Sequence, residues 1–493
     1  MTNSDFQDTK KNNFGCRNRA LLTDFYEITM ANGYLENGLA DQIAYFDMFF
    51  RKVPDNGGFA IAAGLAQLVD YLENLKFDEE DLAYLRDRGI FSEKYLDYLR
   101  NFEFVCDVWA VPEGTPIFPN EPIIKVRGPV VQAQFIETML LLIMNHQSLI
   151  ATKTNRIVRA ASGRAIVEFG ARRAQGGDAA LYGARAAFIG GAAGTSNTLA
   201  AAKFDIPPAG TMAHSWVQLF PSELEAFQAY ARTYLENCVL LIDTYNVLKS
   251  GLPNAIKVAQ EELNPRGFRL KAVRIDSGDF SYLARMVRKE LDQAGLEDCK
   301  IMVSSSLDED IIRELLLLGS PIDSFGVGER LITAQSDPVF GGVYKLSAVE
   351  EDGQIVPKMK ISNNVGKITD PGAKKIFRLY DNATGKGIAD IITLEEETID
   401  DSKPFEIFNP LFPWKKRTVD NFRAEEMMVK IFERGKLIFH LPTVQEIQSY
   451  CARMVDTLWP EILRFENPHE YYVNLSRDLW KLKNDLIYKH SQE

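Results

Sequence analysis

The sequence contains few cysteines, and none of them forms a pair that could serve a metal or redox centre. Its five cysteines are spread over 493 residues, at Cys16, Cys106, Cys238, Cys299 and Cys451. They are odd in number, and no CxxC motif occurs among them. Both a disulfide framework and a zinc site are therefore disfavoured, and the reducing cytoplasm is the expected location.

Excess basic charge and long apolar runs are also missing. Lys and Arg total 56 against 68 Asp and Glu, which gives a net charge of -12. Nucleic acids and anionic membranes need a basic footprint, so both are excluded as main partners, although one pocket can still bind a small anion. The most apolar stretch, Phe135–Met144, is too short to span a bilayer, and residues 1–19 lack the apolar segment of a signal peptide.

Three regions differ in their patterns, and 46% hydrophobic residues are enough for a large core. Residues 1–134 mix helical patterns with an alternating strand at Ile43–Phe50 and predict an N-terminal α+β domain. Residues 135–345 predict a catalytic α/β barrel. Residues 346–493 predict a mixed C-terminal region that packs partly on the N-terminal domain. It has a hairpin turn at Asp381–Gly387 and helical periodicity over Val444–Lys489.

The barrel prediction depends on short apolar runs that end in small or polar residues. These runs are Ala165–Phe169, Ala187–Ile189, Ala209–Met212, Val239–Ile242, Ala272–Ile275, Ile301–Val303 and Ser324–Val327. A helical stretch follows each run, which is typical of βα units around a parallel sheet. The fold class is therefore α/β, with an irregular (β/α) barrel of about seven strands. A doubly wound open sheet is the alternative.

Functional side chains of such a barrel follow the carboxyl ends of its strands. Arg172 and Arg173 follow the first predicted strand, and Arg274 lies just before the end of the fifth. A guanidinium at this edge can bind a carboxylate or a phosphate. An interdomain salt bridge explains Arg172 and Arg173 equally well, whereas Arg274 in an apolar strand needs an anionic partner.

Acidic side chains and a histidine follow other strands. Asp243 follows the fourth predicted strand, and Asp276 and Asp279 flank a small turn after the fifth. Two carboxylates there suit Mg²⁺ or a developing positive charge, but an Asx turn with a helix cap is the alternative. His214 follows the third run and is a candidate nucleophile, acid–base group or ligand, with a hydrogen-bonded structural histidine as the alternative.

Glycines complete this predicted edge. Backbone N–H groups at Gly190–Gly194, Gly326 and Gly328 can approach a phosphate, although neither a GxxxxGK[ST] nor a GxGxxG motif occurs. The edge as a whole predicts an enzyme that acts on a phosphorylated sugar or a nucleotide. We interpret the basic run Lys415–Arg417 as a solvated turn.

Several of these segments together resemble the nicotinate phosphoribosyltransferase family. They occur in the family's order, at Leu22–Met30, Phe169–Arg173, Gly194–Asn197, Gly210–Ser215, Arg274–Asp279, Phe340–Leu346 and Lys367–Gly372. The resemblance implies a type II phosphoribosyltransferase that works as a homodimer with shared active sites. The implied reaction joins nicotinate to 5-phosphoribosyl 1-diphosphate, as the first step of NAD salvage. ATP is the implied co-substrate, which gives a ligase class, and Mg²⁺ is the implied cofactor.

The resemblance also implies roles for single residues. His214 matches the histidine that ATP phosphorylates transiently. Phe169 and Tyr26, the latter lent by the partner subunit, match the rings that sandwich the pyridine. Arg274 and Thr211 match positions that contact nicotinate.

Other matches surround the sugar and its phosphates. Arg172 matches a position near the diphosphate, and Gly326 and Gly328 lie where the ribose 5-phosphate is held. The acids that match positions near the ribose and Mg²⁺ are Asp243, Asp276 and Asp279. Near these acids, oxocarbenium character at the anomeric carbon would be stabilised.

Two positions bear on specificity. The sister family that uses nicotinamide has an acid at the position of Ser196, so the uncharged Ser196 favours a carboxylate substrate. Glu329 stands where many members have Thr, and its carboxylate would repel a phosphate unless it points away. A nicotinamide-specific enzyme and a quinolinate phosphoribosyltransferase are the nearest rivals. A non-catalytic paralogue is a third, which His214, Asp276 and Arg274 together disfavour.

Overall fold

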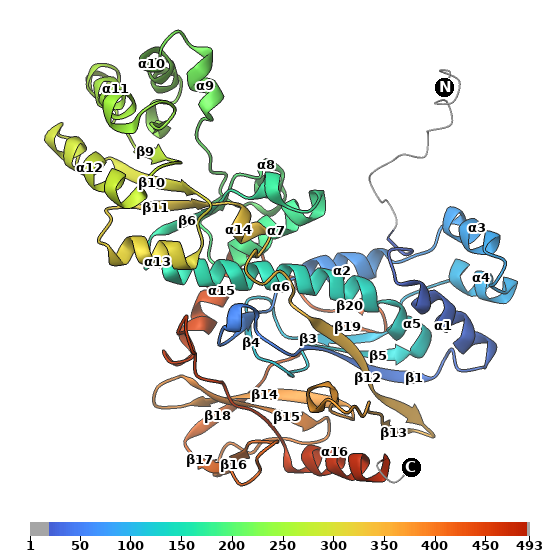
Figure 1. Ribbon diagram of the computed structural model, residues 1–493. Helices are drawn as coiled ribbons and strands as arrows, with labels where there is room; N and C mark the ends of the chain where they lie inside the picture. Colours follow the sequence, from blue (N-terminus) through green and yellow to red (C-terminus); the bar gives the residue numbers. More distant parts are fainter. Residues whose placement is uncertain (1–18, 491–493) are drawn as a thin grey trace, which may run out of the picture.

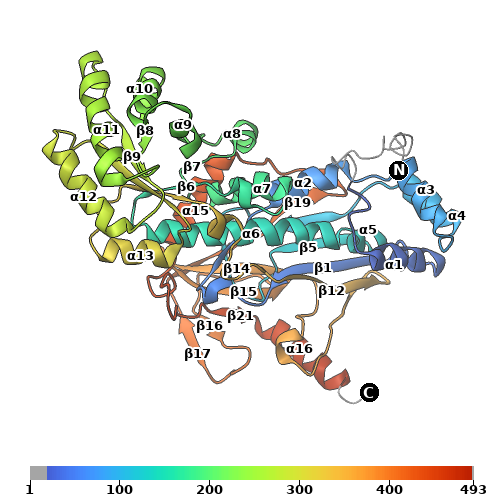
Figure 2. The ribbon, with the colours of Figure 1, turned by 45° about the horizontal axis from the view of Figure 1, so that its top comes forward.

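The computed structural model describes residues 19–490 and arranges them around one long helix, α6 (Glu137–Ala160). A parallel sheet with its helices lies on one side of α6, and an antiparallel sheet lies on the other (Figures 1 and 2). A third sheet, built from C-terminal residues, lies beyond the antiparallel one. Among residues 19–490 no helix is both long enough and apolar enough to cross a bilayer.

The antiparallel sheet has seven strands and is built from distant parts of the chain. Its strand β1 (Ile43–Phe50) has the bounds predicted from the sequence, and it pairs with β5 (Ile124–Pro129) and with β12 (Gly342–Glu351). The chain therefore returns to its N-terminal part after the parallel sheet. The other strands are β3 (Asp107–Ala110), β13 (Gln354–Pro357), β19 (Val429–Glu433) and β20 (Lys436–Leu437).

Short helices surround this sheet and confirm the helical patterns read from the first region. They are α1 (Phe25–Glu36), α2 (Leu65–Asn74), α3 (Glu79–Asp87), α4 (Glu93–Arg100) and α5 (Val130–Phe135), with a ribbon of β2 (Ala60–Ile61) and β4 (Pro116–Ile117). Helix α3 begins with a capping box, in which the side chains of Asp78 and Asp81 satisfy each other's backbone N–H groups.

The parallel sheet has six strands in the order β7-β6-β11-β10-β9-β8. They are β6 (Ala165–Glu168), β7 (Gly194–Thr195), β8 (Val239–Leu241), β9 (Ala272–Ile275), β10 (Lys300–Ser305) and β11 (Ser324–Val327). This order is the chain order bent into a circle that stays open between β7 and β8. A doubly wound sheet would instead reverse direction at a switch point. The expected irregular (β/α) barrel is thus present as a curled half-barrel.

Two of the seven predicted strands are wrong. Ala187–Ile189 is the last turn of α7 (Gly177–Ile189), because the alanine-rich segment that it ends prefers the helix. Ala209–Met212 is an irregular segment that lies beside β7. The two-residue strand β7 takes the place in the sheet that was predicted for Ala209–Met212. The helices around the sheet are α8 (Thr198–Phe204), α9 (His214–Leu219), α10 (Glu223–Thr233), α11 (Leu252–Val258), α12 (Phe280–Gln293), α13 (Glu309–Leu317) and α14 (Glu329–Ile332).

The C-terminal residues form a four-stranded sheet, a hairpin and two helices. The elements are β14 (Lys374–Asp381), β15 (Gly387–Leu394), β16 (Phe405–Phe408), β17 (Lys416–Val419), β18 (Phe422–Glu426), β21 (Val473–Leu475), α15 (Val444–Asp456) and α16 (Arg477–His490). The turn predicted at Asp381–Gly387 is confirmed as the connection from β14 to β15. The helical prediction over Val444–Lys489 fails for residues 457–476, which include Pro460 and Pro468.

The cysteines agree with their interpretation from sequence, whereas the turn predicted for the basic run Lys415–Arg417 is wrong in part, because Lys416 and Arg417 begin strand β17 with exposed side chains. Cys106, Cys238, Cys299 and Cys451 are free and buried, and Cys16 lies outside the described residues. In the basic run, Lys416 pairs with Glu406 across the β16–β17 hairpin at 2.9 Å.

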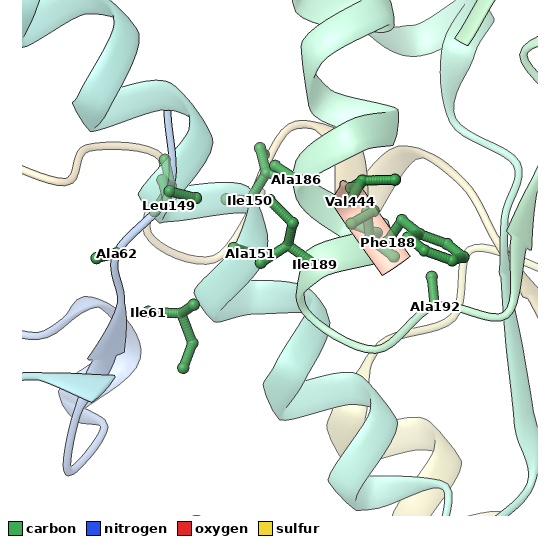
Figure 3. Packing of buried hydrophobic residues seen from close by; sticks show 14 of the residues in the cluster. Ile61, Ala62, Leu149, Ile150, Ala151, Ala186, Phe188, Ile189, Ala192 and Val444 are labelled. Carbon is green, nitrogen blue, oxygen red and sulfur yellow. The ribbon is translucent and has the colours of Figure 1, made fainter. Parts of the chain in front are cut away.

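Buried polar bonds connect α6 to the antiparallel side of the molecule. Thr152 accepts a hydrogen bond from the Ile61 amide at 2.9 Å, and Ser148 accepts one from the Ala63 amide at 3.1 Å. On the other side, apolar side chains join α6 to α7 and α15. Figure 3 shows Ile150 of α6 beside Ile189 of α7, with Phe188 near Val444.

A fully buried ion pair also joins the two sides. The Arg185 guanidinium on α7 donates to both Glu113 carboxylate oxygens at 2.7 and 2.8 Å. Glu113 also accepts from the Gly64 amide at 2.6 Å, and Arg185 donates to Gln147 of α6 at 3.0 Å. Burial alone would raise the pKa of Glu113, but the Arg185 guanidinium together with the Gly64 and Ala66 amides outweighs burial and lowers that pKa. The carboxylate is therefore ionised and contributes stability that is lost as the pH falls through its folded pKa.

We expect Arg185→Met to lower the free energy of unfolding by about 3–5 kcal/mol, because it leaves the Glu113 charge buried without its partner. Adding Glu113→Gln should recover part of this loss. Urea unfolding at neutral pH measures both. The control is Arg86→Met, which breaks an exposed pair with Glu93 and should change stability by less than about 1 kcal/mol. Equal losses for Arg185→Met and Arg86→Met would contradict the assigned role.

Candidate active site

The carboxyl ends of the parallel strands bring most of the predicted site residues to one edge. β6 leads to Phe169, β7 to Ser196, β8 to Asp243, β9 to Arg274 and Asp276, and β11 ends beside Gly328. Because parallel strands end at the same side of a sheet, residues far apart in the sequence become neighbours there. Bonds and close contacts, described next, link Phe169, Arg274, Asp243 and Asp276 directly.

Arg274 is the centre of the cluster. Its Nη1 donates to the Thr211 hydroxyl at 2.6 Å and lies 3.4 Å from the Met212 carbonyl, and its Nη2 is 3.6 Å from Asp276. The guanidinium also lies 5.9 Å from the centre of the Phe169 ring. Burial lowers the pKa of Arg274, partly offset by Asp276 and Asp243, and its Nε is buried without a hydrogen-bond partner. The side chain therefore has a charge and a donor available for an anion.

Asp243 and Asp276 form an acidic group beside Arg274. Asp243 Oδ2 accepts from the Asp276 amide at 3.2 Å and from the Ser277 hydroxyl at 2.5 Å, while the Ser304 hydroxyl donates to Asp276. Asp243 Oδ1 is buried and has no hydrogen-bond partner. An orphaned carboxylate oxygen of this kind fits a cation or a hydroxyl donor supplied by a ligand.

Asp279 has the structural role that was the alternative for it. Its Oδ1 accepts a hydrogen bond from the Tyr282 amide at 2.9 Å and caps the N-terminus of α12. No group of three or more His, Cys, Asp and Glu side chains suited to a metal ion occurs within residues 19–490. A metal at this edge would therefore need ligands from a bound substrate.

His214 begins α9 and is half-buried at the same edge. Its Nδ1 lies 3.1 Å from the Thr244 hydroxyl, in the residue that follows Asp243. The predicted structural alternative, a hydrogen-bonded histidine, and the predicted nucleophile are both compatible with this contact. With Nδ1 engaged by Thr244, the Nε2 atom is the ring nitrogen left for chemistry.

Phe169 is fixed from the β11 side. Its amide donates to the Val327 carbonyl at 2.8 Å, and a Cβ atom at Gly326 would lie 2.6 Å from two carbons of its ring. A Cβ atom at Gly328 would lie 3.1 Å from the Phe169 carbonyl. The two glycines therefore leave room for Phe169.

The remaining predicted residues near this edge are exposed. Arg172, Arg173 and Ser196 have exposed side chains. Glu329 accepts from the Ser306 hydroxyl at 2.6 Å and lies 3.8 Å from Arg173. The Glu329 carboxylate is thus held by a hydroxyl and a guanidinium, which reduces its repulsion of a phosphate.

Tyr26 does not belong to the cluster of its own chain. It lies on α1, whose neighbour Glu27 contacts Thr138 at the first turn of α6. Strand β6 follows the other end of this helix, and 24 residues at about 1.5 Å each make α6 about 36 Å long. Figures 1 and 2 show α1 and the parallel sheet at opposite ends of α6. The Tyr26 side chain is 44% exposed, so it is available to another molecule.

Sequence reasoning gave no role to Glu168, Thr244 or Ser304, which the structure places in direct contact with predicted site residues. Thr244 and Ser304 stand at predicted strand ends, and that position is the signal that could have selected them. Glu168 is a fully buried acid at the last position of β6. Glu168 could have been found by the signal that selected Arg274, which is a charged residue at or near the end of an apolar run.

This curled parallel sheet, with a guanidinium, paired acids and a histidine at its carboxyl edge, defines an α/β-barrel enzyme that binds an anionic substrate. Three models of nicotinate phosphoribosyltransferase match the chain: the N-terminal domain over residues 21–145, the family over residues 164–387 and the C-terminal domain over residues 373–483. The chain belongs to the nicotinate phosphoribosyltransferase family.

Individual relatives agree over nearly the whole length. Nicotinate phosphoribosyltransferase of Bacillus subtilis (strain 168) is 44% identical over 470 residues, which cover 95% of each chain. Nicotinate phosphoribosyltransferase pncB2 of Mycobacterium tuberculosis is 42% identical over 91% of this chain and 89% of its own. The crystal structure of human nicotinic acid phosphoribosyltransferase has a TM-score of 0.84 at 32% identity, covering 94% of this chain and 99% of that one.

We expect Gly326→Ala to displace the Phe169 ring and to lower the free energy of unfolding by about 1–3 kcal/mol, because the new methyl group has no space. Urea unfolding measures the loss. Gly177→Ala is the matched control, since no atom lies within 4 Å of a Cβ there and alanine favours the helix. Identical unfolding midpoints for the two variants would show that the ring moves aside without cost.

Proposed function

We propose that this enzyme transfers the 5-phosphoribosyl group from 5-phosphoribosyl 1-diphosphate to nicotinate, in the first step of NAD salvage. In the reaction the pyridine nitrogen forms a bond to the anomeric carbon, the bond from that carbon to the diphosphate oxygen breaks, and diphosphate leaves. The observation that supports the proposal most is Arg274, whose guanidinium lies over the Phe169 ring with an unpartnered Nε.

The pair of Phe169 and Arg274 suits nicotinate for two reasons. An aromatic ring stacks on the pyridine, and a guanidinium binds its carboxylate with charge-assisted hydrogen bonds. The Thr211 hydroxyl, which Arg274 already contacts at 2.6 Å, would orient the guanidinium or bind the carboxylate itself. Ser196 adds no negative charge at this edge, which favours nicotinate over nicotinamide.

Asp243 and Asp276 would stabilise positive charge at the anomeric carbon as the diphosphate leaves. Mg²⁺, bound together with the diphosphate, would supply positive charge for the leaving group. The orphaned Asp243 Oδ1 supports a cation nearby, and Mg²⁺ commonly takes one or two carboxylates plus substrate phosphates. Asp243 would hold the ion from the protein side, together with Asp279 through the carboxylate oxygen that does not cap α12. Arg172 would face the diphosphate, and Gly326 and Gly328 the ribose 5-phosphate.

We further propose that ATP hydrolysis is coupled to the transfer through His214, which would place the enzyme in the ligase class. In this step His214 Nε2 would attack the γ-phosphorus of ATP, ADP would leave, and water would later release phosphate. The Thr244 hydroxyl at 3.1 Å from Nδ1 would hold the ring in the reactive orientation.

The distance of Tyr26 from the sheet supports a homodimer in which each subunit lends this ring to the other's site. A Tyr26 ring from a second copy would cover the pyridine face opposite Phe169. Within one chain the length of α6 prevents this contact.

The deciding assay incubates the enzyme, Mg²⁺ and 5-phosphoribosyl 1-diphosphate with labelled nicotinate or labelled nicotinamide, with and without ATP. We expect nicotinate mononucleotide and diphosphate from nicotinate, and faster turnover with ATP. Product from nicotinamide but not from nicotinate would contradict the assignment of nicotinate as the substrate. No product from either base would favour a non-catalytic paralogue.

His214→Ala tests the ATP coupling separately. With γ-labelled ATP we expect the wild type to carry phosphate that is labile in acid and stable in base, as a phosphohistidine is, and the variant to carry none. The variant should lose the stimulation by ATP while keeping its thermal stability. His440→Ala serves as the control for nonspecific labelling, because His440 lies between β20 and α15, outside the barrel. Equal labelling of wild type and His214→Ala would refute the role of this histidine.

A further inference from the structure

Glu168 is a buried acid to which the proposed reaction gives no role. Its side chain is fully buried at the end of β6, immediately before Phe169. The Thr195 hydroxyl donates to Oε2 at 2.6 Å, and the Gly170 amide donates to Oε1. Burial raises the pKa of Glu168, and these two donors lower it again only in part. Its hydrogen-bond partners are neutral, so ion pairing does not explain why a carboxylate lies there.

The partners of Glu168 are the residues that frame the proposed base site. Its carbonyl accepts from the Ser196 amide at 2.9 Å, and it lies opposite Thr195 in the register of β6 and β7. Strand β7 has only two residues, so this side-chain bond adds substantially to its attachment. On the other side of β7, the Thr195 carbonyl accepts from the Ala209 amide at 2.9 Å.

These bonds continue into a closed circuit. From Ala209 the chain reaches Thr211 within two residues, and Thr211 accepts from Arg274 at 2.6 Å. Arg274 in turn lies over the ring of Phe169, the neighbour of Glu168. The Phe169 amide donates to the Val327 carbonyl of β11, and the absence of a side chain at Gly326 leaves room for the Phe169 ring. Within this circuit, Glu168 is the buried charged side chain that contacts β7, and it does so through the hydrogen bond from Thr195.

We propose that Glu168 is a positioning residue for the base site: through Thr195 it fixes the separation of Phe169 from Ser196 and from the segment that carries Thr211. This inference rests on the proposed function, because the base bound there is taken to be nicotinate. The carboxylate does not touch the base. It holds two strand ends at the spacing that a pyridine ring stacked on Phe169, with its carboxylate on Arg274, requires.

The test compares Thr195→Val with Thr195→Ser by steady-state kinetics. Valine removes the hydroxyl at nearly constant volume and leaves both a Glu168 oxygen and the Asn197 amide, which donates to Thr195 at 3.0 Å, without this partner, so we expect the KM for nicotinate to rise about tenfold. The KM for 5-phosphoribosyl 1-diphosphate and kcat should stay within about twofold, and serine should restore the KM for nicotinate. A loss of folded enzyme would instead lower the apparent kcat and leave both KM values unchanged, which separates positioning from stability.

Two further variants keep the outcome decisive. Thr393→Val is the matched control, because Thr393 is a buried threonine in β15 whose hydroxyl has no hydrogen-bond partner, and it should leave both KM values unchanged. Glu168→Gln keeps an acceptor for Gly170 and offers Thr195 a donor, so its effect should be smaller than that of Thr195→Val. The double variant Glu168→Gln/Thr195→Val should raise the KM less than the two single effects multiplied.

An unchanged KM for nicotinate in Thr195→Val, or failure of serine to restore it, would overturn the proposal. If the wild type uses nicotinamide instead, the substrate assignment fails, and the same comparison is made with nicotinamide. If no base is converted, urea unfolding of the single and double variants tests the interaction of Glu168 with Thr195. Losses in the free energy of unfolding that simply add in the double variant would show that the two residues act independently, and this would also overturn the proposal.

Discussion

Helix α6 and the buried polar groups attached to it hold the antiparallel and parallel parts of the molecule in one arrangement. Apolar contact with α7 supplies burial, which is strong but not directional. The direction comes from bonds such as Thr152 to Ile61, and from the Arg185–Glu113 pair, which Gln147 of α6 also contacts. Such pairs add little net stability, yet they penalise every arrangement that separates the partners. The position of β6, which follows α6 in the chain, is fixed as a consequence.

This arrangement separates two parts of the proposed site within one chain. The carboxyl edge of the sheet lies at one end of α6, and Tyr26 lies at the other (Figure 1). A rigid helix cannot bend to bring them together, since sharp kinks need a proline or a disruption of its hydrogen bonds, and α6 contains no proline. The length of one helix thus becomes a constraint on assembly: a site that uses both the sheet edge and Tyr26 has to be built from two chains.

Much of the fold and of the sheet edge could be predicted from sequence, for identifiable reasons. The strand Ile43–Phe50 is mostly apolar and rich in aromatic residues, and the runs at Ala272–Ile275 and Ser324–Val327 are short, largely apolar and followed by a polar residue or a glycine, so a local pattern was sufficient. The run Ala187–Ile189 is equally apolar but follows an alanine-rich segment, and only tertiary structure shows that it completes a helix. At the sheet edge the residue types were predictable, whereas the Asp243–Ser277 and Glu168–Thr195 bonds depend on strand order and register, which no local pattern contains.

The contrast between Arg185 and Arg274 is the physical basis of the proposed recognition of an acidic substrate by an acidic chain. Arg185 is buried with a carboxylate on both of its terminal nitrogens, so its desolvation is compensated in the folded protein itself. Arg274 is nearly as buried, yet its nearest carboxylate is 3.6 Å away and its Nε has no hydrogen-bond partner. Folding has therefore already removed water from a guanidinium that the protein leaves incompletely paired. An anion that completes the pairing gains this interaction without further desolvation of the arginine, and the net charge of -12 has little influence at that depth.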